Sequence, residues 1–381
     1  MAKALVTGGA GLIGSHIVDQ LLARGDEVRI LDNLSRPTHL LGKPDWVPAQ
    51  AEFILGDVRN RRDWERALEG VDLVFHQAAA GGFMPEVATY FHTNAVGTAL
   101  LFEVIRDMPH RPRKVVVASS QAVYGEGKYF CDACQAPRYP APRLDDQLVE
   151  GRWEMACPVC RNAMRPIPTD EARVDPRTPY AMSKYAQEMI AIHVGRAFGI
   201  PTVALRYSVT YGPRQSIFNP YTGVCSIFST RLLNDLPPVV YEDGQQTRDF
   251  IYVEDVARAN LLVADRDEAT YQVYNVGTGR PTSVLRFIQL LADLYGKPAT
   301  TIRRGEFRPG EVRHLFADNS RIRALGWAPT VPLEEGLRRY ADWITRQKDI
   351  REYFSEAEAL MKRTQVVRQS RASAWAPALP A

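Results

Sequence analysis

The sequence predicts an α/β protein built on a Rossmann-type, doubly wound parallel sheet, with a smaller mixed α/β lobe and a four-cysteine insertion. Two observations carry this prediction. Short apolar runs rich in β-branched residues alternate with helical patterns over the first 205 residues, as strands and crossover helices do in parallel sheets. The first run also leads directly into a glycine-rich turn at residues 7–14 and then into a helical pattern, which is typical of a dinucleotide-binding unit.

Six apolar runs are expected to be buried parallel strands, because each is short, continuous and rich in β-branched residues. They lie at residues 4–7, 28–32, 53–55, 73–76, 115–118 and 203–205. Helical stretches are expected at about 12–24, 61–69, 88–107 and 179–198. Gly199, just past the last stretch, fits a cap at a helix C-terminus.

The pattern along the chain also suggests how it is divided into domains. We expect residues 1–205 to form an NAD-binding domain, with an insertion at about 126–172 and a further segment at about 248–297 that returns to it. The irregular stretches 206–247 and 298–345 are expected to form the smaller, substrate-binding lobe. Residues 346–381 are expected to be a C-terminal helix and a loose tail, since the end is polar and then rich in Ala and Pro.

Composition excludes several classes of partner. The 381 residues include 47 basic and 44 acidic side chains, for a net charge of +3, which does not favour nucleic acid or an anionic membrane. No apolar run approaches the roughly 20 residues of a membrane span, and the first residues run into a strand without signal-peptide features. We therefore expect a cytoplasmic protein that binds neither nucleic acid nor membrane.

The turn after the first strand has the glycines that a dinucleotide pyrophosphate requires. Gly8 permits a tight turn, Gly11 lets the backbone approach the pyrophosphate, and Gly14 allows close contact between helix and strand. The amide groups at the helix N-terminus attract the phosphates. The sequence therefore predicts NAD binding at this turn, with Leu12 and Ile13 beside the cofactor.

Acidic residues after the next two strands bear on the choice of cofactor. Asp32 ends the second strand, where its carboxylate can accept from the adenosine ribose 2′-OH and would repel a 2′-phosphate, so we expect NAD over NADP. Arg36 lies near enough in sequence to accept a 2′-phosphate instead. Asp57 is expected either to reach the adenine or to cap the next helix. The remaining expected cofactor contacts are Asn33, Val58 and Ala78.

Tyr180 and Lys184 are the strongest candidates for chemistry. Residues i and i+4 share one helix face, and Thr178 as N-cap with Pro179 as first helical residue would start this helix. A phenol is a poor base at neutral pH, since its ordinary pKa is about 10. A nearby ammonium favours the phenolate, and so would the positive ring of an oxidised nicotinamide. Tyr180 is therefore the expected base, with Lys184 lowering its pKa.

Four of the five cysteines form two C-x-x-C pairs, Cys131 with Cys134 and Cys157 with Cys160. Two such knuckles 22 residues apart predict a structural zinc site, whose four thiolates leave no position for a catalytic water. Free thiols, or an iron–sulfur or redox pair, are the alternatives. A segment with six prolines buries little, so metal binding would supply its folding free energy. Cys225 is expected to be a lone buried thiol.

With these residues in view, residues 1–345 apart from the insertion resemble the extended short-chain dehydrogenases, and among them the NAD-dependent sugar-nucleotide epimerases and dehydratases. The matching segments are 8–14, Asp57, 76–79, 119–125, Tyr180 with Lys184, 205–207, 211–213, 248–255, 274–277 and 325–327. The insertion is similar to one in some 4-epimerase-like members of this family, including ones assigned to dTDP-L-rhamnose.

The resemblance implies hydride chemistry at C4 of a nucleotide sugar. Ser120 would bind the reacting hydroxyl, Tyr180 would be the base, and Lys184 would hold the nicotinamide ribose. Family dehydratases carry an Asp–Glu pair where this chain has Gln121 and Ala122, and decarboxylases and 3,5-epimerases carry Glu or Cys at the second of these positions. C4 epimerisation is therefore the leading hypothesis. The alternatives are a 4-ketoreductase or dehydrogenase, a relative of the 4,6-dehydratases, and a non-catalytic NAD-binding scaffold whose zinc ribbon contacts a partner.

The same resemblance implies a substrate site and an assembly. Arg248 and Arg308 would clamp the substrate diphosphate, Glu311 would lie near the nucleotide ribose, and Asn94 would be largely structural. Relatives pair through the helices near 88–107 and 179–198, so a homodimer is expected.

Overall fold

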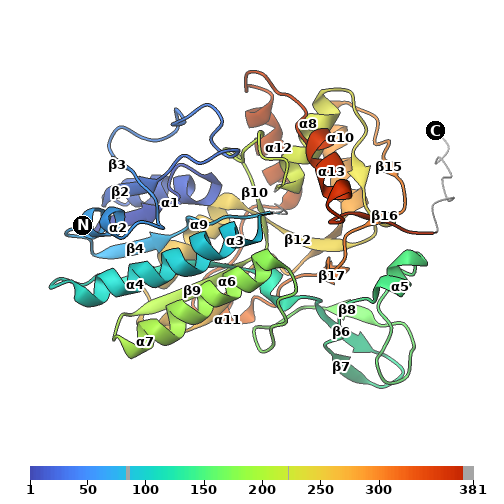
Figure 1. Ribbon diagram of the computed structural model, residues 1–381, viewed down its shortest axis with the longest axis horizontal. Helices are drawn as coiled ribbons and strands as arrows, with labels where there is room; N and C mark the ends of the chain where they lie inside the picture. The colour runs from blue at the N-terminus through green and yellow to red at the C-terminus, as the bar shows by residue number, and fades with distance from the viewer. Residues whose placement is uncertain (83–85, 222, 372–381) are drawn as a thin grey trace.

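A computed structural model of the chain describes residues 1–82, 86–221 and 223–371 (Figure 1). Its larger part is a seven-stranded, fully parallel sheet in the order β13-β9-β5-β4-β1-β2-β3. The strands are β1 Lys3–Thr7, β2 Glu27–Asp32, β3 Glu52–Leu55, β4 Leu73–His76, β5 Lys114–Ser120, β9 Thr202–Tyr207 and β13 Val273–Val276. All six expected strands are confirmed. The strand order reverses between β1 and β4, which is where doubly wound sheets bind ligands.

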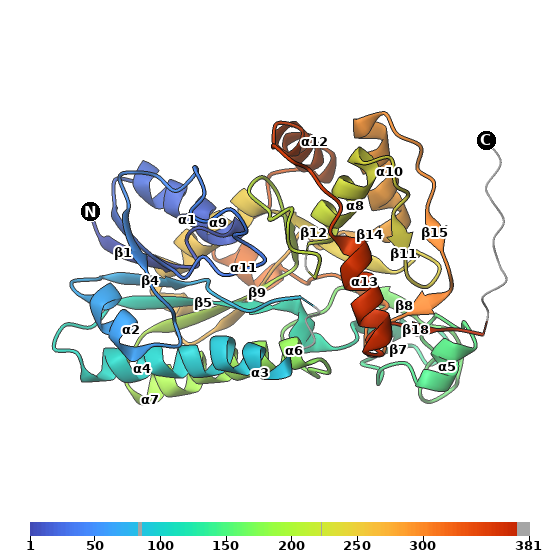
Figure 2. The same ribbon diagram turned by 45° about the horizontal axis from the view of Figure 1, so that its top comes forward.

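Helices cover both faces of this sheet, as Figure 2 shows. One face packs against α1 (Leu12–Ala23) and α9 (Val253–Ala264). The other packs against α2 (Arg61–Leu68) and the two long helical stretches expected from the sequence. Each stretch contains a π-helical segment. The first runs as α3 Val87–Tyr90, Phe91–Val96 and α4 Gly97–Asp107, and the second as α6 Pro179–Met189, Ile190–Val194 and α7 Gly195–Ala197. Gly199 follows with φ +66°, as expected for a C-terminal cap.

The smaller lobe is built on a mixed four-stranded sheet. Its strands are β10 Val209–Tyr211, β12 Thr247–Tyr252, β14 Pro281–Ser283 and β17 His314–Leu315. The helices α8 Val224–Leu233, α10 Val284–Tyr295 and α12 Leu333–Ile344 enclose its core, where the Phe250 and Phe287 rings stack 4.0 Å apart. Cys225 lies in this core with 1% exposure, which confirms a lone buried thiol.

The segment 248–297 is divided between the two parts of the molecule. Helix α9 and strand β13 join the large sheet, as expected, whereas β12, β14 and α10 pack in the smaller lobe. The apolar face of α10 has a strong helical period, but its sequence does not say against which core that face packs. Other short elements are the 3-10 helices Gln121–Tyr124 and Asp267–Ala269, α11 Ser320–Ala324, β11 Val239–Val240, β15 Ile302–Arg303 and β16 Glu306–Phe307.

The cysteine insertion folds as a separate small module below the smaller lobe in Figure 1. It has a three-stranded antiparallel sheet in the order β7-β6-β8 and one short helix, α5 Asp145–Val149. The strands are β6 Lys128–Cys131, β7 Ala136–Arg138 and β8 Arg165–Ile167. Its core consists of Tyr129, Met155, Met164 and the four cysteines. So small a core fits the expectation that a metal contributes to its folding.

Within the segment 346–381, the expected C-terminal helix is present, but the residues directly after it do not form a loose tail. Helix α13 Phe354–Arg363 is followed by β18 Arg368–Gln369, which pairs antiparallel with β16. The Arg371 amide then donates to the Val149 carbonyl of the insertion at 2.6 Å. The sequence did not predict this strand, because its residues are polar and main-chain pairing with β16 holds it in place. Residues 372–381 lie outside the described part of the chain.

Within residues 1–82, 86–221 and 223–371, no helix combines the length and apolar character needed to cross a membrane.

Candidate active site

The glycine-rich turn joins β1 to α1 at the carboxyl edge of the sheet. Gly8 has φ +67°, and a Cβ placed on it would lie 2.8 Å from the Ala78 amide nitrogen. A Cβ on Gly14 would lie 2.2 Å from the Gly8 carbonyl oxygen, so the helix can pack this closely only with glycine there. Gly11 is the N-cap, and no side chain of a described residue caps the helix. The bare, glycine-lined helix N-terminus fits a phosphate group.

Asp32 lies at the end of β2 beside this turn and is buried. Its two carboxylate oxygens accept hydrogen bonds from the backbone amides of Ala10 at 3.0 Å and Leu34 at 2.9 Å. These bonds fix the carboxylate where the sequence predicts the adenosine ribose. Arg36 lies in the loop that follows and is exposed.

Asp57 does not cap the next helix. The N-cap of α2 is Asn60, whose side chain accepts from the Arg62 amide at 3.0 Å. Asp57 instead accepts from the Asn33 side-chain amide at 2.9 Å and pairs with Arg59, whose hydrogen bonds hold the pKa of Asp57 at about 2. A carboxylate anchored to Asn33 on the exposed edge of the sheet fits the adenine-side alternative.

Two other expected cofactor residues differ in accessibility. Val58 is 5% exposed and packs in the core under α2 and α4. The Ala78 amide lies against Gly8 and donates to the Thr7 hydroxyl at 3.1 Å. Ala78 therefore lies beside the turn, whereas the side chain of Val58 faces the core.

The expected start of α6 is confirmed. Thr178 is the N-cap and accepts from the Ala181 amide at 3.2 Å, and Pro179 is the first helical residue. This helix carries Tyr180 against Ser120, the last residue of β5. Burial raises the pKa of Tyr180, and its hydrogen bond with Ser120 opposes that rise. The shift is opposite to the one expected from Lys184, because in this geometry desolvation of the phenolate dominates.

Lys184 is buried, with 2% exposure. Burial lowers its pKa to about 7, against the opposing charge of Glu188. Its ammonium donates to the side-chain oxygen of Gln187. The side-chain nitrogen of Gln187 in turn donates to the Thr98 hydroxyl at 3.0 Å. The Thr98 hydroxyl proton goes to the Asn94 carbonyl at 2.6 Å. Gln187 is thereby oriented with its oxygen towards Lys184.

This hydrogen-bond chain continues to the glycine-rich turn. Burial lowers the pKa of His76 to about 3, so the ring is neutral. Because the Thr98 oxygen can only accept, His76 carries its proton on Nε2, 3.0 Å away, and Nδ1 accepts from the Thr7 hydroxyl at 2.8 Å. Thr7 itself accepts from Ala78. A directed, fully buried chain therefore connects the candidate catalytic lysine with the cofactor turn.

Gln187 and Thr98 are the residues that sequence reasoning missed. Both lie on expected helices, but nothing in the sequence shows that these two helices face each other at these positions. Asn94 was expected to be largely structural, and it is buried with its side chain bonded to the Ala80 backbone and Ser183.

A buried ion pair holds α6 against the sheet. Arg206 on β9 makes two hydrogen bonds with Glu188, at 2.6 and 2.9 Å, and Glu188 also accepts from Ser119 at 2.7 Å. Because both charged side chains are 4% exposed, separating them would leave an uncompensated charge. The pair fixes α6, and with it Tyr180, relative to the end of β5.

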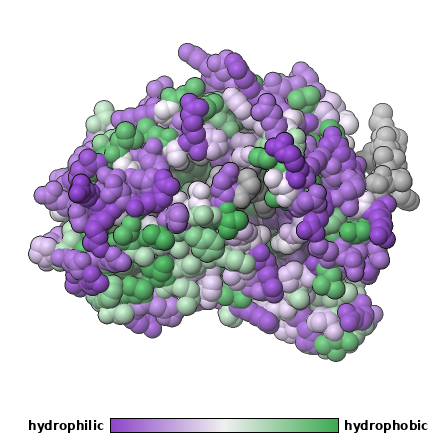
Figure 3. Space-filling view, in the orientation of Figure 1, coloured by the Kyte–Doolittle hydropathy of each residue, from purple (hydrophilic) through white to green (hydrophobic). Residues whose placement is uncertain are grey.

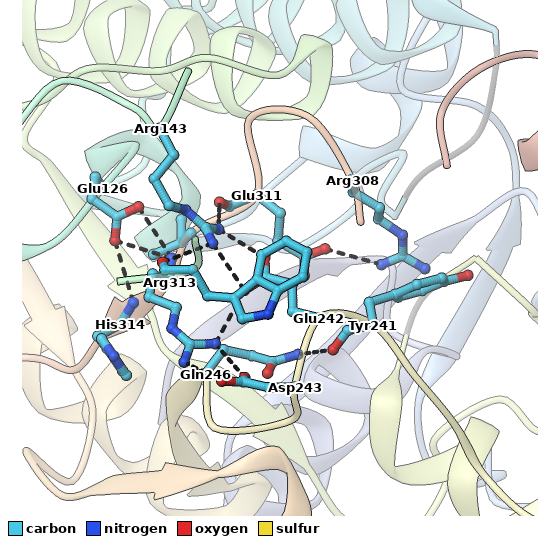
Figure 4. Close-up of polar contacts among 12 residues, drawn as sticks. Glu126, Arg143, Tyr241, Glu242, Asp243, Gln246, Arg308, Glu311, Arg313 and His314 are labelled. Atoms are coloured by element: carbon cyan, nitrogen blue, oxygen red, sulfur yellow. Dashed lines mark hydrogen bonds and ion pairs between the residues drawn. The ribbon is translucent and has the colours of Figure 1, made fainter. Parts of the chain in front are cut away.

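The three candidate substrate residues come together from two distant segments. Glu311 pairs with Arg248 at 3.3 Å and with Arg308 at 3.6 Å, and the Arg308 guanidinium lies 4.4 Å from the Tyr241 ring centroid. Figure 4 shows Arg308 over Tyr241, with a dashed line joining Arg308 to Glu311. Two guanidinium groups flanking one carboxylate form a positively charged site, which fits an anionic group. Here Glu311 contacts both arginines.

The four cysteines form one cluster. Their sulfur atoms all lie within 4.8 Å of one another, with Cys131–Cys160 at 3.5 Å and Cys134–Cys157 at 3.9 Å. A tetrahedral site with metal–sulfur bonds of about 2.3 Å requires sulfur–sulfur separations of about 3.8 Å. The cluster fits a four-thiolate metal site.

Comparisons with known proteins agree with this geometry. Residues 4–143 match the NAD dependent epimerase/dehydratase family, and residues 162–340 match a family described as GDP-mannose 4,6 dehydratase. The chain is 34% identical over 361 residues to dTDP-L-rhamnose 4-epimerase of Burkholderia thailandensis, covering 91% of this chain and 96% of that protein.

Solved structures resemble the whole fold. UDP-glucose 4-epimerase of Thermotoga maritima, solved with UDP-glucose, matches with a TM-score of 0.74 at 30% identity, covering 90% of this chain and 99% of that one. UDP-glucuronic acid 4-epimerase from Bacillus cereus, solved with UDP-glucuronic acid and NAD, matches with a TM-score of 0.73 at 27% identity and the same coverage. Identity and coverage of this extent show that the chain belongs to the NAD-dependent epimerase/dehydratase family.

Proposed function

We propose that this enzyme is an NAD-dependent nucleotide-sugar 4-epimerase, which inverts C4 through a transient 4-keto sugar. The main support is the position of Tyr180 against Ser120, next to a neutral Gln121–Ala122 pair. Oxidation and reduction at C4 need one base, whereas elimination of water needs an additional acid and base. The Gln121 side-chain oxygen is buried without a hydrogen-bond partner among the described residues, so it suits a sugar hydroxyl.

Each residue of the site has a separate role in the proposed reaction. Tyr180 accepts the proton of the C4 hydroxyl, and Ser120 holds that oxygen. When bound, NAD supplies the hydride acceptor and a positive ring. Because burial favours the neutral forms of both Tyr180 and Lys184, the phenolate depends on positive charge beside it. The 4-keto sugar turns about its diphosphate, which Arg248 and Arg308 hold, and the proton and hydride return with C4 inverted.

The cofactor assignment rests on the turn and on Asp32. The bare N-terminus of α1 accepts a pyrophosphate, and the buried Asp32 carboxylate accepts from a ribose hydroxyl but repels a phosphate. NAD is therefore favoured over NADP, although Arg36 is near. The other proposed cofactor contacts are Leu12, Ile13, Asn33, Asp57 and Ala78, with Lys184 at the nicotinamide ribose.

A 4,6-dehydratase is the second candidate, because residues 162–340 match a dehydratase family. That segment does not include residues 121 and 122, where the additional acid and base of a dehydratase would lie. A 4-ketoreductase would consume its cofactor stoichiometrically, whereas an epimerase regenerates it in each turnover.

Nucleotide-diphosphate sugars are the proposed substrate class. The named relatives act on or bind dTDP-linked and UDP-linked sugars. Arg248 and Arg308 form the proposed diphosphate site, since a guanidinium matches phosphate oxygens in geometry and charge. Glu311, which pairs with both arginines, is proposed to lie near the nucleotide ribose.

We also propose one structural zinc ion in the cysteine cluster. Four thiolates at this spacing match zinc, and the two knuckles offer no open coordination position for catalysis. The ion would hold the insertion together, because its core contains few other apolar side chains.

A homodimer through the two long helical stretches is the proposed assembly. Large apolar side chains on these helices are 40–51% exposed, namely Val87, Val96, Met182 and Met189. Figure 3 shows hydrophobic residues gathered over α4 and α6 at the lower left. A second copy packing against this face would bury them.

Two glycine variants test the cofactor site. Gly14→Ala should lower the midpoint of thermal unfolding, because the backbone overlap outweighs the gain of about 1 kcal/mol in helix propensity. Gly11→Ala adds a Cβ 3.3 Å from the Gly8 carbonyl oxygen, a milder contact, so it should lower this midpoint less than Gly14→Ala does and still weaken NAD binding. Calorimetry with NAD measures the cofactor affinity of each variant.

The same titration of the wild type with NADP tests Asp32, and tighter binding of NADP than of NAD would contradict its assignment.

Tyr180→Phe tests the catalytic base. The variant should bind NAD normally and lose turnover by at least about 100-fold, since a general base contributes on that scale. A panel of UDP, dTDP and GDP sugars, followed by NMR for inversion at C4, measures turnover. Tyr185→Phe on the same helix is the control. A Tyr180→Phe rate near that of the wild type would remove this residue from the mechanism.

Elemental analysis tests the metal site. Protein purified without chelator should contain one zinc per chain, and Cys131→Ser should lose the ion and make the remaining cluster thiols titratable. Cys225→Ala, in the other core, should keep the zinc. Wild-type protein without zinc and with all thiols reactive would refute the site.

Light scattering tests the assembly. The wild type should have twice the 42.8 kDa mass of one chain, and Met182→Glu should shift it towards monomer by introducing a charge into the apolar face. Leu41→Glu changes an equally apolar residue, 81% exposed in the loop after β2, and should leave the mass unchanged. A monomeric wild type at micromolar concentration would contradict the proposal.

A further inference from the structure

Two arginines form the centre of a buried ionic network where the insertion meets the smaller lobe (Figure 4). Arg143 comes from the insertion, and its guanidinium binds both oxygens of Glu242 in the lobe, at 2.8 and 2.9 Å. Arg313 lies just before β17 and is 0% exposed. It binds Asp243 at 2.7 and 2.9 Å, Glu242 at 3.1 Å and Glu154 of the insertion at 3.0 Å.

Glu126, the first residue of the insertion, adds a carboxylate to this network. Glu126 accepts from the backbone amides of Arg313 at 3.0 Å and His314 at 3.2 Å, and from the Tyr129 hydroxyl at 2.8 Å. The insertion thus contributes Arg143, which pairs with the Glu242 carboxylate of the lobe, and Glu126, which accepts from backbone amides of the lobe. Buried charges are tolerated only when they are paired, so the insertion and the lobe are held in one relative position.

The network continues into the proposed diphosphate site. Arg143 also donates to the main-chain oxygen of Glu311, at 2.9 Å. From the opposite side, Arg248 donates to the main-chain oxygens of Val312 at 2.7 Å and Arg313 at 3.2 Å. The backbone of residues 311–313 is therefore held between the insertion and Arg248, while the Glu311 side chain contacts both Arg248 and Arg308.

We propose that Arg143 is a positioning residue for the substrate diphosphate, acting through Glu242 and the Glu311 main chain on Arg248 and Arg308. The identity of the ligand rests on the function proposed above. Only arginine can bind both oxygens of Glu242 and a carbonyl together, because its planar group presents five donors in fixed directions. Glu242 itself has φ +56°, a conformation rare for a residue with a side chain, and its two arginine partners hold it there.

Calorimetry with UDP, dTDP and GDP on the full-length protein tests this role without requiring turnover. Arg143→Lys should weaken binding of the preferred nucleoside diphosphate by about 10-fold or more, because a small displacement of a binding group has effects on this scale. NAD affinity should stay within about twofold, since the cofactor turn lies outside the network. With a sugar that is turned over, KM should rise while kcat changes little.

Two further variants make the test decisive. Glu242→Gln removes the partner charge from the lobe side and should reproduce the loss, so a failure of Arg143→Lys to fold would not end the test. Arg152→Lys changes an exposed arginine of the same insertion and should bind like the wild type. Unchanged diphosphate affinity in folded Arg143→Lys or Glu242→Gln would overturn the positioning role and leave the proposed function standing. Wild-type protein that binds none of the three diphosphates would overturn both.

Discussion

The active site depends on keeping Lys184 buried. An ammonium group removed from water is costly, and its lowered pKa records that cost. The hydrogen bonds from Lys184 through Gln187, Thr98 and His76 to Thr7 recover part of it, because the ammonium keeps an acceptor in the Gln187 side-chain oxygen. The Asn94 carbonyl sets which group donates in each of these hydrogen bonds, because it takes the Thr98 hydroxyl proton and leaves the Thr98 oxygen only able to accept. The same contacts that orient the lysine therefore hold the turn where the cofactor is proposed to bind.

The substrate-binding side of the site is held mainly by ion pairs. Its residues come from the polar start of β12 and from the loop before β17. Ion pairs and hydrogen bonds from the insertion hold this loop in place. Such pairs add little free energy of folding but fix geometry, since breaking one leaves a buried charge. The insertion is thus integrated with the smaller lobe rather than appended to it.

Sequence patterns predicted the parts of the molecule that depend on local chemistry. The six strands, the Thr178 cap and the cysteine pairs follow from burial, capping and metal-ligand spacing, which nearby residues determine. The pairing of Gln187 with Lys184, the divided segment 248–297 and strand β18 depend on which distant elements meet. The raising of the Tyr180 pKa by burial was not predicted, because charge spacing is visible in a sequence and desolvation is not.

In the proposed reaction, C4 is inverted by removal and return of one hydride within a single site. A nucleotide sugar deuterated at C4, incubated with the enzyme in ordinary water and followed by NMR, tests this step. We expect the configuration at C4 to invert while deuterium stays at C4 in both epimers, because a transferred hydride does not exchange with solvent. Loss of deuterium to water in step with inversion, or elimination of water from the sugar, would contradict it.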